Sequence, residues 1–391
     1  MIRLNFARIY FFILLIVCDN FTLLSQVPEV INVESGMNNP GHLVLSDIAY
    51  DVQYIPLETN EYNLIGNVNK IKFNGKYFFV QDANPPSLHV FDQKGKYIRK
   101  IGKHGRGPNE YNYLNDFTFS NKKPQVWLLT SIPYKIMEYN LNGDFVKQIE
   151  YSTLDNYNRI ESLLNDKYLI MRTNSFGNTP FTFGIFSEDG TLLKNVIKPE
   201  QFKYTGGVSS SKNNFWFYVF NNNCYVKENV LNDTLYRIST SLEFLPKYIF
   251  DSGKYKQTMD FRQNFSEYYK RKDLNYIIHN SFFETSTVLI YSYLFNMNTR
   301  LDYYDKTIKK SFNLKGITND LDGGLDFVPE YQINNLIIGY ASVFELKDYI
   351  DSGIFKNSTT KYPEKKKELE RLANSLDEND NPVLILIKLK E

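Results

Sequence analysis

A β-hairpin pattern recurs along this chain and constrains its fold more than any other feature. In the first copy, Leu88–Phe91 leads into a turn at Gly95, and Tyr97–Ile101 leads out of it. Glycine can take the positive φ that closes a short hairpin. The pattern returns with turn glycines at Gly143 and Gly190, which lie 48 and 47 residues further along. Apolar residues alternate with period two in each copy, which predicts strands and argues against a helical repeat.

Two weaker copies of the pattern, Thr234–Leu242 and Leu301–Ile308, continue the series. A repeat of about 40–50 residues built from four short strands is typical of a β-propeller blade. A single blade cannot bury both of its faces, so neighbouring blades stack around a central axis. The length of 391 residues suits six such units. We therefore predict an all-β, six-bladed β-propeller with four-stranded antiparallel blades over residues 43–391, preceded by a linker over residues 26–42.

The two ends of this predicted ring supply strands of their own. We expect the N-terminal stretch Leu43–Leu57 and the C-terminal stretch Asn381–Leu389 to share a blade, because joining them removes an open sheet edge and closes the ring. Two short helical insertions interrupt the strands. Tyr255–Leu274 has aromatic residues spaced for one face of a helix, and Pro363–Leu376 begins with a proline and carries an apolar stripe.

The N-terminus has the features of an export signal. Arg3 and Arg8 give the N-terminus a positive charge and precede the apolar run Ile9–Val17. This run is too short for a bilayer span, which needs about 20 residues, and it fits a secretory signal peptide. Cleavage after Ser25 defines a signal peptide over residues 1–25. The alternative is lipoprotein processing with lipidation of Cys18, although the residue before this cysteine is larger than is usual there. Both routes predict export.

A glycine-rich connector, IGKHGRGPNEY, occupies residues 101–111 directly after the first hairpin. The segments Asn232–Tyr236 (NDTLY), Asp320–Gly324 (DLDGG) and Glu378–Leu384 (ENDNPVL) follow in order. This ordered set resembles the NHL-type propellers, and resembles more closely the exported bacterial six-bladed beta-propeller family, over about residues 43–391. The resemblance implies a propeller in the envelope of a Gram-negative bacterium, in the periplasm, the outer membrane or at the cell surface. It implies no catalytic residues.

The charge balance limits the class of partner. The chain has 45 Lys and Arg against 44 Asp and Glu, a formal net charge of +1. Proteins that bind nucleic acids usually carry a basic excess, so we expect no nucleic-acid partner. We expect no transmembrane span either, and membrane contact only through a lipid on Cys18. The expected partner is an unidentified protein or glycan of the envelope.

Four charged residues are the candidates for ligand contact. Arg106 and Glu110 lie in the glycine-rich connector, where the favoured interpretation is structural: they tie a tight crossing between blades to nearby backbone. Asp320 and Asp322 suggest a cation, because calcium binds clustered carboxylates. The spacing of an EF-hand loop is absent, and a structural turn is the favoured interpretation. No cofactor is predicted, and a divalent cation held on the propeller axis is the alternative.

The sequence contains no recognisable catalytic constellation. Neither an H-E-x-x-H nor a G-x-S-x-G motif occurs. We expect Trp127 and Trp216 to pack in the interior rather than to form a sugar platform, and Cys224 to be a small buried residue. The predicted function is an exported, non-enzymatic binding or scaffold protein that holds its ligand or partner on the loop face of the ring. The alternative is a metal-assisted hydrolase or lyase of the lactonase or NHL-lyase kind.

Overall fold

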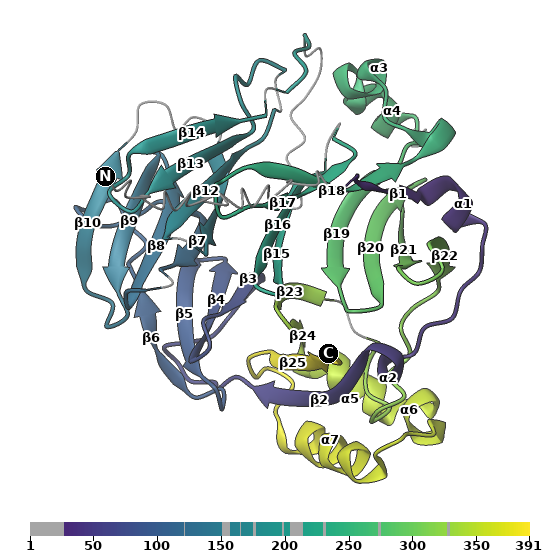
Figure 1. Cartoon of the computed structure of the whole chain (residues 1–391). Coiled ribbons are helices and arrows are strands. Elements are labelled where there is room, and N and C mark those ends of the chain that lie inside the picture. Colours follow the sequence, from purple (N-terminus) through teal and green to yellow (C-terminus); the bar gives the residue numbers. More distant parts are fainter. Residues whose placement is uncertain are drawn as a thin grey trace, which may run out of the picture.

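The computed structural model describes residues 27–391, except 121, 151–156, 165, 175–176, 198, 204–213, 230–231, 273–274 and 327–328. Within these residues the strands form four four-stranded sheets and one nine-stranded sheet. The sheets stand around a common centre, so the molecule is a propeller-like all-β fold (Figure 1). The expected signal peptide over residues 1–25, with Cys18, lies outside the described residues.

The four-stranded sheets are antiparallel, and neighbouring strands are consecutive in the chain. Their strands are β3 (Val68–Phe73), β4 (Tyr77–Ala83), β5 (Pro86–Asp92) and β6 (Tyr97–Ile101); β7 (Tyr113–Phe119), β8 (Gln125–Ser131), β9 (Lys135–Asn140) and β10 (Phe145–Glu150); β11 (Tyr157–Leu163), β12 (Lys167–Arg172), β13 (Phe183–Ser187) and β14 (Leu192–Val196); and β19 (Ile278–Glu284), β20 (Val288–Phe295), β21 (Asn298–Asp305) and β22 (Lys310–Leu314).

The nine-stranded sheet is mixed and consists of two antiparallel groups of four strands with one extra strand at its edge. A single parallel bridge between Val219 and Ile333 joins the two groups. The first group is β15 (Phe215–Phe220), β16 (Asn223–Glu228), β17 (Thr234–Ile238) and β18 (Phe244–Asp251); the second is β23 (Pro329–Ile333), β24 (Leu336–Ala341), β25 (Val383–Leu389) and β2 (Ala49–Pro56).

The turns of the repeated hairpins lie where the sequence pattern predicts them. Gly95, Gly143 and Gly190 have φ values of 81°, 88° and 92°, and each joins the third strand of a four-stranded sheet to the fourth. Glycine is favoured there because other residues rarely adopt this left-handed conformation. In the weaker copies, the β17–β18 and β21–β22 hairpins, Leu242 and Lys309 take positive φ values instead. The absence of glycine explains why these copies are harder to recognise.

The two ends of the chain meet in one sheet. β2 pairs antiparallel with β25 over Ala49–Pro56 and Val383–Leu389. β25 therefore lies between β24 and β2 and has a neighbour on both sides. A central position suits its continuous apolar sequence, VLILIKL, of which all but Lys388 is buried.

The structure corrects the prediction of a linker over residues 26–42. From Glu29 this stretch forms a strand, β1 (Glu29–Asn32), which pairs parallel with β18, and a short helix, α1 (Val33–Met37). Ile31, Val33 and Met37 are buried in the core that β15–β18 and β19–β22 share. The segment is part of the folded domain because these apolar side chains cover the outer edge of the sheet.

The expectation of two helical insertions also needs correction. The stretch 255–274 contains two short helices, α3 (Met259–Gln263) and α4 (Phe265–Lys270), rather than one. They are separated at Asn264, where φ is −111° and ψ is 24°, and the Asn264 side chain donates to Asp260 Oδ1 at 2.9 Å. Asparagine commonly ends helices through such local bonds. Phe261 is buried, whereas Tyr269 is about half exposed. Only part of the expected aromatic face is therefore packed against other residues.

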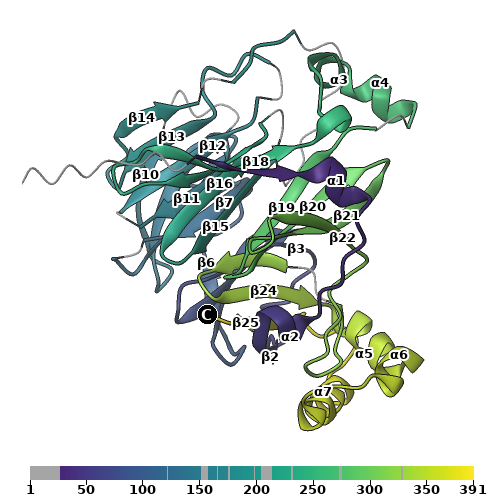
Figure 2. The same cartoon turned by 45° about the vertical axis from the view of Figure 1, so that its right-hand side comes forward.

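The helical region before β25 is larger than the sequence pattern suggested. The expected helix is present as α7 (Pro363–Ser375), with Leu369 and Ala373 buried. Two further helices, α5 (Val343–Asp351) and α6 (Gly353–Asn357), precede it. Buried side chains of the three helices form an apolar cluster with Val383 of β25. Figure 2 shows the helices beside the sheets. Ser342 and Glu345 form a capping box at the start of α5, a signal that was readable in the sequence.

Candidate functional site

The first strand of each sheet or group carries the polar residues that meet at the centre of the molecule. Side chains from β3, β7 and β11 meet there, and β15 lies beside β19 and β23. Alternate residues of a strand point the same way, so Lys70 and Lys72 project together from β3. Asp116 of β7 and Glu161 of β11 meet them. We call these four residues the central charge cluster.

The central charge cluster is closely paired. Lys70 Nζ lies 2.6 Å and 2.8 Å from the two carboxylate oxygens of Asp116 and 3.1 Å from Glu161 Oε1. Lys72 Nζ lies 2.6 Å from Glu161 Oε2 and 2.7 Å from the carbonyl oxygen of Phe117. Every oxygen of the two carboxylates thus accepts a hydrogen bond from a lysine. The bonds connect three sheets at their inner strands.

In this cluster, burial and the neighbouring opposite charges shift the pKa values in opposite directions. Burial lowers the pKa of Lys70 to about 8, although Asp116 and Glu161 favour its charged form. Burial by itself would raise the pKa of Asp116, but the charges of Lys70, Lys72 and Arg159 hold it below its ordinary value. Asp116 is therefore ionised at neutral pH.

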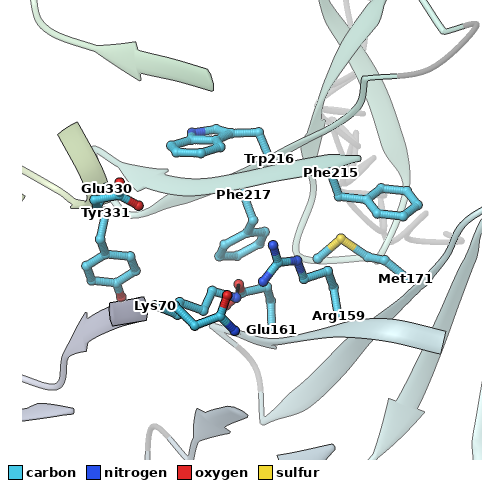
Figure 3. Close-up of a pocket in the computed structure, with 10 residues that line it drawn as sticks. Lys70, Arg159, Glu161, Met171, Phe215, Trp216, Phe217, Glu330 and Tyr331 are labelled. Atoms are coloured by element: carbon cyan, nitrogen blue, oxygen red, sulfur yellow. Dashed lines mark hydrogen bonds and ion pairs between the residues drawn. The ribbon is translucent and has the colours of Figure 1, made fainter. Parts of the chain in front are cut away.

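A small cavity of about 40 Å³ lies beside the cluster (Figure 3). Its lining includes Lys70, Arg159, Glu161, Trp216 and Tyr331. A cavity of this size holds about one water molecule. It is too small for an organic ligand.

A larger pocket of about 460 Å³ adjoins this cavity, and Trp216 and Glu330 line both. We call it the central pocket. Figure 3 shows Trp216 on one side of β15, with Phe217 and Tyr331 on the opposite side. The pocket extends from Trp216 across one face of the β19–β22 sheet. Its volume lies within the range of small-molecule sites, about 300–1,000 Å³.

The lining of the central pocket combines apolar groups with neutral hydrogen-bonding groups and few charges. Its apolar residues are Trp216, Phe283, Ile290, Leu301, Leu314, Ile317 and Pro329; its neutral polar residues are Asn280, Ser281, Ser292, Thr299 and Asn313; its charged residues are Arg300, Lys315 and Glu330. Such a mixture suits a ligand that has both an apolar surface and hydrogen-bonding groups.

The connector residues Arg106 and Glu110 lie away from both pockets. Glu110 accepts from the backbone N–H of Gly107 at 2.8 Å and pairs with Lys103 at 2.7 Å. The hydrogen bond from Lys103 comes first among the causes that hold the pKa of Glu110 below its ordinary value. Glu110 therefore ties the connector to its own backbone, and Arg106 is exposed beside it.

Asp320 and Asp322 lie between β22 and β23 and have separate partners. Asp320 accepts from the backbone N–H of Ser46 at 2.8 Å and from its hydroxyl at 2.6 Å. Asp322 is buried and accepts from Tyr54 at 3.1 Å and from Asn319 at 2.6 Å. The two carboxylates thus hold a loop against the N-terminal elements α2 (Leu45–Ile48) and β2. The structure does not bring them together with Arg106 or Glu110.

The two tryptophans have different environments. Trp127 is 2% exposed and packs against Tyr168 with a ring separation of 3.8 Å, as expected for a core residue. Trp216 packs against Phe283 but also lines the central pocket. Cys224 is buried as expected, and burial raises the pKa of its thiol to about 12.

The sequence reasoning missed the central charge cluster and the central pocket. A signal was present: Lys70, Lys72, Asp116 and Glu161 are charged residues inside strands that are otherwise rich in apolar residues. Such residues in the first strand of a repeat point either to the centre or to solvent. Strand periodicity alone does not distinguish these two directions.

The comparisons with known proteins place this chain in a family. It belongs to the family described as Domain of unknown function (DUF4934), whose pattern it matches over residues 28–388. No curated protein matches the chain. Among the residues that the structure describes, no helix has both the length and the apolar character needed to cross a bilayer.

Two solved structures of similar shape come from Bacteroides species. One, named "Putative exported protein" from Bacteroides fragilis, is 20% identical with a TM-score of 0.68, and the match covers 93% of this chain and 99% of that one. Another, a member of the DUF4221 family from Bacteroides vulgatus, is 11% identical with a TM-score of 0.51, covering 88% and 97% of the two chains. At these identities the likeness concerns the fold.

Proposed function

We propose that this protein is an exported, non-enzymatic binding protein of the bacterial envelope that holds a small ligand in the central pocket. The observation that carries the proposal is the pocket itself. It has about 460 Å³ of space, it lies where the first strands converge, and its lining mixes apolar and neutral polar groups. Binding groups placed at the centre of a ring can vary without disturbing the packing between sheets.

The proposal includes a six-bladed ring. The nine-stranded sheet is interpreted as two blades, β15–β18 and β23–β24–β25–β2, because their strands are paired by a single bridge, from Val219 to Ile333. The apolar clusters support this division. One cluster packs the last group against the first sheet, with Ile338 and Leu386 beside Ile71 and Val80. On this interpretation β2 and β25 close the ring, and the repeats are of the NHL-like type.

Export is supported by two observations. Two arginines, Arg3 and Arg8, precede the N-terminal apolar run, as in a signal peptide. A similar solved structure also carries the name "Putative exported protein". Cleavage after Ser25 would release the protein into the periplasm, whereas lipidation of Cys18 would anchor it to a membrane of the envelope.

The binding function is preferred to the metal-assisted hydrolase or lyase because of the central carboxylates. Both oxygens of Asp116 and both oxygens of Glu161 accept hydrogen bonds from Lys70 or Lys72. A lysine ammonium at these oxygens competes with a cation for the same lone pairs. Among the described residues, no group of three His, Cys, Asp or Glu side chains is placed to hold a metal ion.

A thermal-shift screen of mixed small molecules tests the proposed function. A ligand at 100 times its Kd stabilises a protein by about 2.7 kcal/mol, which raises Tm by several degrees. We expect compounds that stabilise the natural protein to lose this effect in Ser281→Phe, which fills the central pocket. The matched control is Leu193→Phe on β14, about half exposed and far from the pocket lining. Hits that are unaffected by Ser281→Phe would contradict the proposal.

A further inference from the structure

We infer that the ligand of the central pocket is a saccharide of one or two sugar rings. This inference rests on the proposed function and adds the chemical class of the ligand. A sugar ring has an apolar C–H face, which gains from contact with an aromatic side chain, and hydroxyls around its edge that donate and accept hydrogen bonds. The lining of the pocket offers groups for both.

Trp216 supplies the aromatic surface. Its ring is partly exposed and is held edge-on against Phe283, with ring centroids 5.1 Å apart and an angle of 76° between the planes. The indole N–H of Trp216 is buried and has no acceptor among the described residues. The indole N–H of Trp127 is also buried without an acceptor among the described residues, so this feature is not specific to the pocket. The ring of Trp216, rather than its N–H, is the part that a ligand would contact.

Ser281 and Ser292 supply a second donor. Their hydroxyl oxygens lie 2.6 Å apart, and Asn280 donates to the oxygen of Ser292 at 3.3 Å. Two hydroxyls carry two protons, and the bond between them uses only one. The pair therefore keeps one O–H that it can donate to a ligand, whichever serine donates to the other. Thr299 adds a further hydroxyl to the same pocket.

The two basic residues of the pocket are compatible with a neutral or an acidic ligand, and Glu330 is the acidic residue of the same lining. The Arg300 guanidinium lies 5.2 Å from the centre of the Phe295 ring, a cation–π contact that engages it within the protein. Lys315 is exposed at the rim. An exposed lysine can pair with the carboxylate of an acidic sugar, and a neutral sugar does not require it.

A peptide and an acyl chain fit these features less well. A peptide commonly binds by adding a strand to an open sheet edge. The edge of β22 beside the pocket is already covered, because Asn313 exchanges backbone hydrogen bonds of 2.8 Å with Asn39 and Gly41. An acyl chain would leave the remaining O–H donor of the serine pair without an acceptor.

The two tryptophans make a direct test practical, because Trp127 and Trp216 are the only ones in the chain. In the Trp127→Phe protein, Trp216 is the single fluorescent indole. We would titrate this protein with maltose, cellobiose, the N-acetylglucosamine disaccharide and digalacturonate, with tetra-alanine and octanoate as comparison ligands. Calorimetry on the natural protein would provide each Kd independently. If Trp127→Phe does not fold, the difference spectrum between natural protein and Trp216→Phe replaces it.

We expect at least one saccharide to shift the emission of Trp216. Its Kd should rise at least tenfold in Trp216→Ala and about threefold or more in the Ser281→Ala/Ser292→Ala double variant, and stay within twofold in Trp127→Phe. Binding of tetra-alanine or octanoate that depends on Trp216, without binding of any saccharide, would overturn the ligand class and leave the proposed function standing. Saccharide binding that ignores Trp216→Ala would overturn the site. If no compound of this panel or of the wider screen binds, both proposals fail.

Discussion

The two sides of the molecular centre are built from equivalent strands but are filled in different ways. On the side of β3, β7 and β11, two lysines and two carboxylates bond across three sheets and leave space for about one water. On the side of β15, β19 and β23, short hydroxyl side chains and one tryptophan leave a pocket of about 460 Å³. The comparison shows that side-chain length and charge pairing, not strand order, decide where this fold is open.

A second buried polar network, centred on Glu284, lies beside the central pocket. Glu284 of β19 accepts from the hydroxyls of Tyr218 and Tyr248 at 2.8 Å and from Lys306 at 2.7 Å. Gln332 of β23 donates to the carbonyl oxygen of Glu284 at 2.6 Å. These contacts connect β15, β18, β19 and β23 beside the central pocket.

The largest effect is expected from removal of Asn381–Glu391, which deletes β25. This strand lies between β24 and β2, so its loss exposes apolar residues on both neighbours and opens the sheet. We expect the whole protein to lose its cooperative unfolding transition in circular dichroism and calorimetry. Removal of Lys390–Glu391 alone is the control and should have little effect. A chain without β25 that melts like the full one would disprove the closed ring.

The next largest effect is expected from Asp116→Ala in the central charge cluster. The substitution leaves Lys70 buried without its nearest carboxylate. Breaking a buried pair by removing one partner typically costs about 3–5 kcal/mol, because an uncompensated charge remains. Urea unfolding would measure the loss of stability. The matched control is Lys103→Ala, which removes an exposed ion pair with Glu110 and should change stability little. Equal effects of the two variants would show that the cluster is not buried as described.

A smaller effect, which depends on pH, is expected from Lys70. Its pKa is about 8 in the folded protein and its ordinary value is 10.5. Between these values the unfolded chain binds more protons, so this group makes stability rise with pH from about 8 to 10. The gain is at most roughly 3 kcal/mol, since one pKa unit is about 1.4 kcal/mol.

Comparison with Lys70→Met isolates this contribution, because other groups also titrate in the same range. The unfolding free energy of the natural protein should rise relative to that of the variant as the pH increases. A difference between the two proteins that stays constant from pH 8 to 10 would mean that the pKa of Lys70 is not lowered.

The smallest effect is expected from removal of metal ions. The oxygens of Asp116 and Glu161 are occupied by lysine donors, so a chelator such as EDTA should leave Tm unchanged. Elemental analysis of the purified protein should find no divalent cation in stoichiometric amount. A clear fall in Tm with EDTA, reversed by one added cation, would favour the metal-assisted enzyme and weaken the proposed binding function.

The parts of the fold that sequence could predict are those set by neighbouring residues. Gly95, Gly143 and Gly190 mark hairpins because the turn itself requires their backbone conformation. The continuous apolar run Val383–Leu389 marks a strand covered on both faces. The helix α5 also carries a local signal, the capping box at Ser342 and Glu345.

The candidate site was not predictable in the same way. Arg106, Glu110, Asp320 and Asp322 stand in recognisable motifs. In the structure, Glu110 and the two aspartates bond to nearby loops and strands. The residues that meet at the centre stand in no motif. Trp216 looked like a packing residue, and it does pack, but its other face lines the central pocket.

Local sequence by itself determined the strands, the hairpin turns and the repeat, since each depends on backbone preferences over a few residues. Only the tertiary structure decided which side chains share the centre. Lys70 and Glu161 are 91 residues apart, and Ser46 and Asp320 are 274 apart. Such pairs form when successive sheets turn around a common centre, and the angle between sheets depends on packing along their whole faces. Periodicity along one strand carries no information about that angle.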